Sequence, residues 1–179
     1  MVKPRLLRPS YEKAGNSALA WQSTADDLLL GAHLLDRLYR QSFPLRVRNS
    51  RVIRGHTGLY SPSRLLYAAA IEALLKARAV KRGHRFVVAN KFRAIPGTER
   101  DPHNLVLLAK ATGLRLSRKT TYLLGRLSYA FEMARYPIAK NAVRHSPEPG
   151  LSTTTLSYRF STDAPALRGL VKRLRASAK

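Results

Sequence analysis

The sequence predicts an all-α protein, a bundle of four long helices with additional short pieces, and three observations support this. Leucine and alanine recur every three or four positions in several long segments. Capping residues, prolines and glycines stand at the ends of those segments. Hydrophobic residues make up 45% of the 179 positions, which is enough for one domain with a packed core.

The first segments are a leader, a helix and a loop. Residues 1–16 form a basic, proline-containing leader that we expect to be extended. The first helix is expected over Ser17–Gln41, where apolar residues follow the helical period and the acids lie towards its N-terminal half. Phe43–Tyr60 is expected to be a loop that is rich in arginine and has no acid.

The central helix is expected over Ser61–Gly83. Ser61 and Pro62 are a typical helix start, and Gly83 is a typical stop. The segment is apolar nearly all round, which is typical of a helix packed on several sides, but it is too short and too charged to span a bilayer. Glu72 and Lys76 are four residues apart and can pair. That pair is either structural, or Glu72 orients a cation at a functional site.

Shorter elements follow. His84–Arg100 is expected to form a short strand or a packed loop. A helix is expected to open at Asp101 and Pro102 and to run to Gly113. Ser117 is expected to cap a fourth long helix that Pro137 ends. The remaining segments are a linker over 141–160, with its serine- and threonine-rich half undecided between strand and coil, and a basic amphipathic helix over 161–179, expected from Thr162 to Ala178.

The leucine-rich face of this last helix has three interpretations: docking on the bundle, docking on a partner subunit, or lying on a membrane surface. Because docking is the commonest fate of such a face, we expect no membrane partner. The sequence start has no long apolar run typical of a secretory signal, so a cytoplasmic protein is expected.

The charge balance indicates a polyanionic partner. Lysine and arginine number 33 against 10 acids, a net charge of +23, so nucleic acid is the natural counterpart. Without cysteine there is no disulfide or thiolate metal site, and no phosphate-binding loop or paired-histidine zinc motif is present, so neither metal nor cofactor is expected. The basic runs predict these nucleic-acid contacts: Arg46, Arg48, Arg51, Arg54, Lys81, Arg82, Arg85, Lys91, Arg93, Arg168, Lys172, Arg173 and Arg175.

Phe86, Phe92 and Tyr158 stand among these cations. They are placed either to stack on the bases of a single strand, which favours RNA, or to serve as ordinary core aromatics.

Three segments in order resemble the HEPN family of small helical-bundle proteins: LLYAAAIEALLKA at 65–77, HNLVLLAKATGL at 103–114 and YAFEMARYPIAK at 129–140. The resemblance covers about 17–140 and implies a HEPN-like up-and-down bundle of four to five antiparallel helices, followed here by a basic C-terminal extension. Such a bundle is commonly a homodimer. Many members are metal-independent RNases of toxin–antitoxin or phage-defence systems, whereas others bind RNA or serve as interaction modules.

The usual catalytic motif of that family is an arginine followed after a short spacer by a histidine. Arg135 matches the arginine, but Pro137 cuts the helix and the next histidine, His145, lies too far along. The hypothesis is therefore a catalytic set of Glu72, His103, Arg135 and Tyr136 around a pocket for a phosphate or nucleotide. Tyr67 and Tyr129 are expected to complete its lining, together with the ring of Tyr136.

The alternatives for these residues are structural. His103, expected in the first turn of its helix, either caps or packs there, and Arg135 forms a clamp with Glu132 or with Glu72.

The predicted function is nucleic-acid binding, to RNA in preference, with metal-independent RNase activity as its extension. Two alternatives stay open at this point: a non-catalytic interaction module for an acidic protein partner, and a non-specific DNA-binding protein.

Overall fold

The computed structural model describes residues 10–42, 50–135 and 160–177, and side chains over 10–41, 62–131 and 163–177. Within these ranges the chain is mostly helical, and a two-stranded sheet is the only strand structure. The all-α prediction is confirmed. No described helix has the length and apolarity that crossing a membrane requires.

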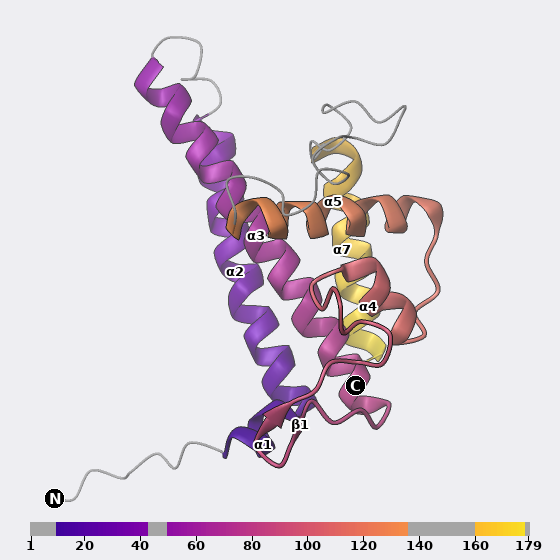
Figure 1. The fold of residues 1–179 in the computed structure, drawn as a ribbon. Helices are drawn as coiled ribbons and strands as arrows, with labels where there is room; N and C mark the ends of the chain where they lie inside the picture. Colours follow the sequence, from indigo (N-terminus) through magenta and orange to yellow (C-terminus); the bar gives the residue numbers. More distant parts are fainter. Residues whose placement is uncertain (1–9, 43–49, 136–159, 178–179) are drawn as a thin grey trace, which may run out of the picture.

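The longest elements are two antiparallel helices, α2 (Ala18–Ser42) and α3 (Ser50–Lys81), which lie side by side (Figure 1). They approach closely at Gly31, where an added Cβ would lie 3.2 Å from Cδ1 of Leu66. The prediction for α2 is confirmed, with Ser17 Oγ accepting a hydrogen bond from the amide of Ala20 at 3.2 Å.

The predicted start of the central helix was wrong. α3 begins at Ser50, so the predicted loop over 43–60 is helical from that residue on, and Pro62 stands inside the helix. An interior proline removes one helical hydrogen bond and crowds the carbonyl four residues earlier, whereas a proline in the first turn does neither. The rule that a capping residue followed by proline starts a helix therefore predicted a first turn at Pro62.

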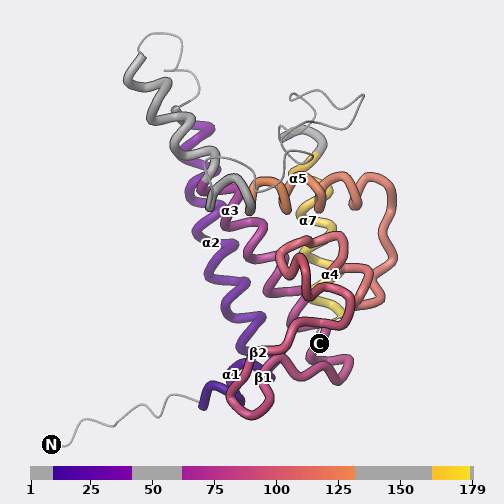
Figure 2. The backbone as a smooth tube through the Cα atoms, viewed as in Figure 1, coloured from indigo at the N-terminus to yellow at the C-terminus, as the bar shows by residue number. Residues whose placement is uncertain are grey.

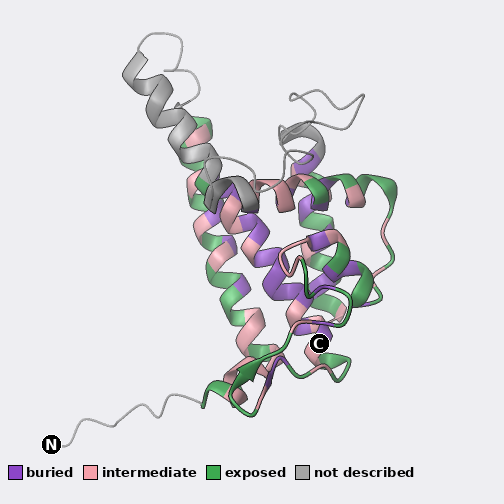
Figure 3. Ribbon diagram, in the orientation of Figure 1, coloured by how far each residue is buried: buried purple, intermediate pink, exposed green. Residues whose placement is uncertain are grey.

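The central position of α3 is confirmed. Its residues Ile71, Leu74 and Leu75 are fully buried, and Figure 3 shows buried positions along its lower half. The surrounding helices are α4 (Leu105–Ala111), α5 (Arg118–Arg135) and α7 (Phe160–Ser177), and each contacts α3. All contribute leucines to one hydrophobic core.

The helices are not all aligned. α5 runs across the other long helices, and α7 descends beside α3 in the same direction (Figures 1 and 2). α7 buries Leu167, Leu170 and Leu174 in the common core, so its apolar face docks on the bundle. Its start is tied to α5 by an ion pair between Asp163 and Arg126.

Two short elements pack at the N-terminal end of α2. α1 (Tyr11–Gly15) is capped by Ser10, so the expectation of an extended leader was wrong for these residues. Strands β1 (Val87–Val88) and β2 (Lys91–Phe92) form a hairpin, which agrees with the strand interpretation of this segment. Asn16 joins the two elements, since its side-chain amide donates to the carbonyl of Val87 at 2.7 Å and accepts from the amide of Val87 at 3.0 Å.

The two later helix starts differ in outcome. Ser117 caps α5 as predicted, accepting from the amide of Thr120 at 3.2 Å. α4, in contrast, starts after Asn104, whose Oδ1 accepts from the amides of Val106 and Leu107 at 3.1 Å. The predicted opening at Asp101 and Pro102 was wrong because Asn104 is the effective cap and the preceding residues form a turn.

Candidate functional site

The first predicted cluster is centred on Glu72, which α3 places in the core with 6% of its surface exposed. Its two carboxylate oxygens are both engaged. Oε1 lies 2.7 Å from Nζ of Lys76, and Oε2 lies 2.9 Å from Nδ1 of His103. The structure therefore brings together Glu72 and His103, which are far apart in sequence, and it confirms the pairing of Glu72 with Lys76.

Lys76 is held from its other side by aromatic rings. Its Nζ lies 4.8 Å from the ring centroid of Trp21, 5.4 Å from that of Phe92 and 5.9 Å from that of Phe86. The side chain of Lys76 is only 14% exposed. Cation–π attraction and the Glu72 carboxylate together offset the free-energy cost of removing its ammonium group from water. Phe86 and Phe92, predicted as base-stacking residues or core aromatics, here stack on each other and contribute to this enclosure.

His103 lies in the turn before α4 and not in the first turn of the helix, which corrects its expected position. Its ring stacks on Phe131 of α5 with centroids 5.0 Å apart, while Glu72 holds Nδ1. A carboxylate-held imidazole is an arrangement that acid–base catalysis uses. Here the same contacts also join α3, α5 and the turn that precedes α4.

The other members of the predicted catalytic set lie apart from this cluster or outside the described residues. Arg135 ends α5 one turn after Phe131, and its side chain is not among those described, nor is any part of Tyr136. Tyr67 was placed wrongly. It lies five residues before Glu72 on α3, hence on another face of the helix, and its hydroxyl donates to Asp36. Tyr129 is partly buried in α5.

A second acidic cluster lies between α2 and α3. The carboxylate of Asp36 accepts from the hydroxyl of Tyr67 at 2.9 Å and contacts Nη2 of Arg64 at 3.5 Å. Asp36, Tyr67 and Arg64 are each 3% exposed. The ring of His33 meets that of Tyr67 edge to face at 5.7 Å.

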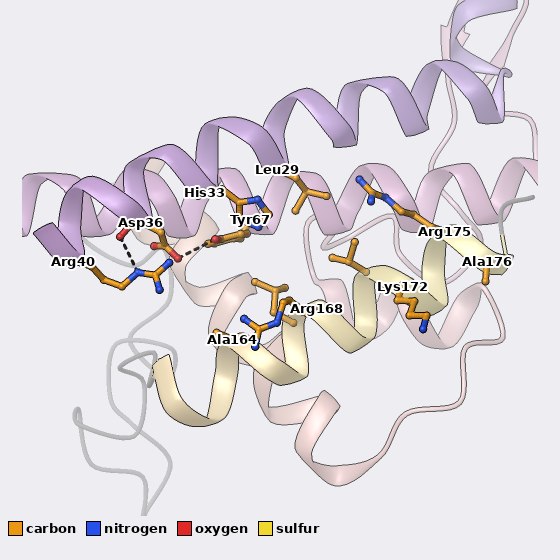
Figure 4. A pocket seen from close by; sticks show the side chains of 12 residues that line it. Leu29, His33, Asp36, Arg40, Tyr67, Ala164, Arg168, Lys172, Arg175 and Ala176 are labelled. Carbon is orange, nitrogen blue, oxygen red and sulfur yellow. Dashed lines mark hydrogen bonds between the residues drawn. The ribbon is translucent and has the colours of Figure 1, made fainter.

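A cavity of about 630 Å³ opens beside this second cluster, between α2, α3 and α7 (Figure 4). Its apolar part is formed by Leu29, Leu167 and Val171. Its polar lining comprises His33, Asp36, Arg40, Tyr67, Arg168, Lys172 and Arg175. The volume is in the range of small-molecule sites, which are apolar with a few polar groups that set orientation.

Four cations stand around this cavity. Arg40 comes from α2, whereas Arg168, Lys172 and Arg175 come from α7, on the opposite wall in Figure 4. Arg175 pairs with Asp26. Arg168 and Lys172 are exposed and form no hydrogen bond or ion pair within the described residues, so their charge is available to an anion.

The predicted nucleic-acid contacts fall into separate groups. Lys81, Arg82 and Arg85 lie at and just after the C-terminal end of α3, and Lys91 and Arg93 lie in and after β2; all five are exposed, and Arg85 pairs with Glu12 at 2.5 Å. Arg173 of α7 points to α5, where it donates to Thr120 at 3.4 Å. Arg46 and Arg48 lie outside the described residues, and Arg51 and Arg54 belong to α3 with side chains that are not described.

Sequence reasoning missed Asp36, His33 and Arg40 as lining residues of the cavity. Asp36 follows Leu29 and Ala32 at the helical spacing that places all three on the buried face of α2. An acid at such a position indicates a polar cluster, because a buried carboxylate needs partners. The identity of those partners depends on how α3 and α7 pack, which local spacing does not encode.

Comparisons with known proteins gave no match to any family model, curated protein or solved structure. Within the described residues, no group of three or more histidine, aspartate or glutamate side chains is placed to hold a metal ion.

Proposed function

We propose that this protein binds single-stranded RNA, and that the cavity between α2, α3 and α7 holds one nucleotide of the strand. The observation that carries the proposal is the position of Arg168 and Lys172 at the rim of a nucleotide-sized, largely apolar cavity. Neither cation forms a hydrogen bond or ion pair within the described residues. Phosphates would contact the rim while the base occupies the apolar interior.

The distribution of charge supports a polyanion as the ligand. Three acids, Asp36, Glu72 and Asp163, are buried and paired inside the molecule. The exposed acids within the described side chains are Asp26, Asp27 and Glu99. Against them stand these exposed cations: Lys13, Arg37, Arg40, Lys81, Arg82, Arg85, Lys91, Arg93, Arg100, Lys110, Arg115, Arg118, Lys119, Arg168, Lys172, Arg173 and Arg175. Such an excess gives a sequence-independent, salt-sensitive affinity for phosphates.

A single strand fits a concave site better than a duplex does. A base can enter a cavity only when it is unstacked and unpaired, which costs little in single-stranded RNA. His33 and Tyr67 supply ring surface at the cavity wall, and the ring nitrogens of His33 offer a hydrogen bond to a base.

The proposal includes a HEPN-like bundle and RNase activity. The carboxylate-held imidazole of His103 is the feature that supports catalysis. Its engagement in core contacts supports binding as the primary activity, and cleavage would require Arg135 to complete the site.

The experiment measures binding and cleavage of a labelled single-stranded RNA by the full chain at several salt concentrations, with chelator present. The test variant is Arg168→Gln/Lys172→Gln. A matched control, Lys110→Gln/Arg115→Gln, removes the same charge from exposed positions outside the cavity. We expect the logarithm of the wild-type affinity to fall linearly with the logarithm of salt, and the slope to decrease by about two in the test variant.

The control variant distinguishes a site from a diffuse charge effect. A larger loss of affinity in the test variant than in the control supports the cavity, and equal losses remove it from the interface. Absence of salt-sensitive RNA binding by the wild type overturns the proposal and leaves an acidic protein as the expected partner. Chelator-resistant cleavage that Arg135→Ala abolishes would establish the RNase.

A further inference from the structure

The face of α2 that points away from the bundle carries a regular pattern. Six residues follow one another at spacings of four and three, which is the repeat of a helix–helix seam: Ser23, Asp27, Leu30, Leu34, Arg37 and Gln41. All six are exposed, and the leucines strongly so, with 62% for Leu30 and 53% for Leu34. The buried face of the same helix is formed by other residues, among them Ala25, Leu29 and Ala32.

The order of residues along this seam is self-complementary. Read from either end it runs polar, charged, leucine, leucine, charged, polar, with an acid at one charged position and a base at the other. An antiparallel copy of the same helix therefore meets it with leucine opposite leucine and with Asp27 opposite Arg37. A twofold interface requires such a match, because every contact occurs twice with its partners exchanged.

We propose that two copies of this chain associate through α2, antiparallel, about a twofold axis between Leu30 and Leu34. Leu30 packs against Leu34 of the second copy, and Asp27 pairs with Arg37 of the second copy. Asp27 and Arg37 form no hydrogen bond or ion pair within the described residues, so both are available for this contact. Leu38, 50% exposed, lies beside the seam and extends its apolar part.

Charge favours a second copy over other occupants of this face. A chain with a net charge of +23 repels its copies nearly everywhere, but each seam contributes one acid and one base and is locally neutral. A membrane surface is a poor match, since the seam is narrow and carries an acid next to its leucines. His33 is close to the seam on α2 and also lines the cavity, so the second copy would lie beside the cavity mouth.

The experiment determines the mass in solution by light scattering after gel filtration, over a wide range of protein concentration and at moderate salt. The expected mass of the wild type is twice the 20.0 kDa of the chain. Leu34→Glu is expected to halve it, whereas Leu107→Glu, a control at an exposed leucine of α4, leaves it unchanged.

Charge reversal supplies the decisive comparison. In Asp27→Arg, an arginine at position 27 of each copy faces Arg37 of the other. In Arg37→Asp, an aspartate at position 37 of each copy faces Asp27 of the other. Each single variant therefore has two like-charge contacts per dimer and is expected to be monomeric. The double variant restores both pairs with exchanged signs and is expected to be dimeric again. A monomeric wild type, or a dimer that these three variants leave intact, overturns the proposal.

Discussion

Two buried carboxylates, Glu72 of α3 and Asp36 of α2, lie at different faces of α3, and their surroundings differ in one respect. Glu72 has both oxygens engaged at short distance by Lys76 and His103, and aromatic rings surround these partners. Asp36 has a short contact to Tyr67 and a longer one, 3.5 Å, to Arg64, and it borders an open cavity.

The comparison indicates how burial of a charge relates to function. The Glu72 cluster is closed and joins α3 to α5 and to the turn that precedes α4, so its contacts are explained by packing. The Asp36 cluster adjoins a cavity that none of the described side chains fills and that four cations surround. Burial of the acid is common to both clusters, and the cavity next to Asp36 is the feature that distinguishes them.

The largest effect is expected from Glu72→Ala. This change leaves the Lys76 ammonium enclosed without its carboxylate, and loss of one partner of a buried pair costs about 3–5 kcal/mol of unfolding free energy. Urea denaturation measures it. The control Glu72→Leu/Lys76→Met removes both charges and is expected to recover most of the loss. RNA affinity of the folded fraction should not change in either variant, and a selective loss of RNA binding or cleavage would assign Glu72 to the functional site instead.

A smaller effect is expected from Asp36→Asn. The amide oxygen still accepts from Tyr67, but the charge opposite Arg64 is lost, which costs about 2 kcal/mol because the Arg64 contact is long. Removing a negative charge from the wall of the cavity should at the same time strengthen binding of an anion there. Urea denaturation and RNA titration of the same preparation test both statements. Weaker RNA binding with unchanged stability would contradict both.

The sequence was sufficient for features that depend on neighbours along the chain. The periodicity of α2, the cap at Ser117 and the pairing of Glu72 with Lys76 all depend on residues within one or two turns, and each is confirmed. The start of α3 was not predictable in this way, because Pro62 is of a residue type that favours a first turn and is disfavoured inside a helix, where the structure places it.

The candidate site was predictable only in part, for a related reason. Glu72 and His103 were singled out from residue type, and the fold does bring them together. The cavity arises where α7 docks beside α2, and the sequence placed the basic face of α7 correctly without indicating which residues of α2 it would meet. Long-range packing supplies that information.

The smallest expected effects come from the same substitution at two histidines, His103 in the Glu72 cluster and His33 beside Asp36. His103→Gln removes the stacking on Phe131 and weakens the contact to Glu72, so we expect a loss of about 1 kcal/mol of unfolding free energy with unchanged RNA affinity. His33→Gln changes an exposed residue at the cavity wall, so stability should move by less than about 0.5 kcal/mol while RNA binding weakens. Because the same substitution is made in both places, side-chain chemistry is matched and only location differs. The opposite pattern, with His103 controlling RNA binding or cleavage and His33 controlling stability alone, would exchange the roles of the two clusters.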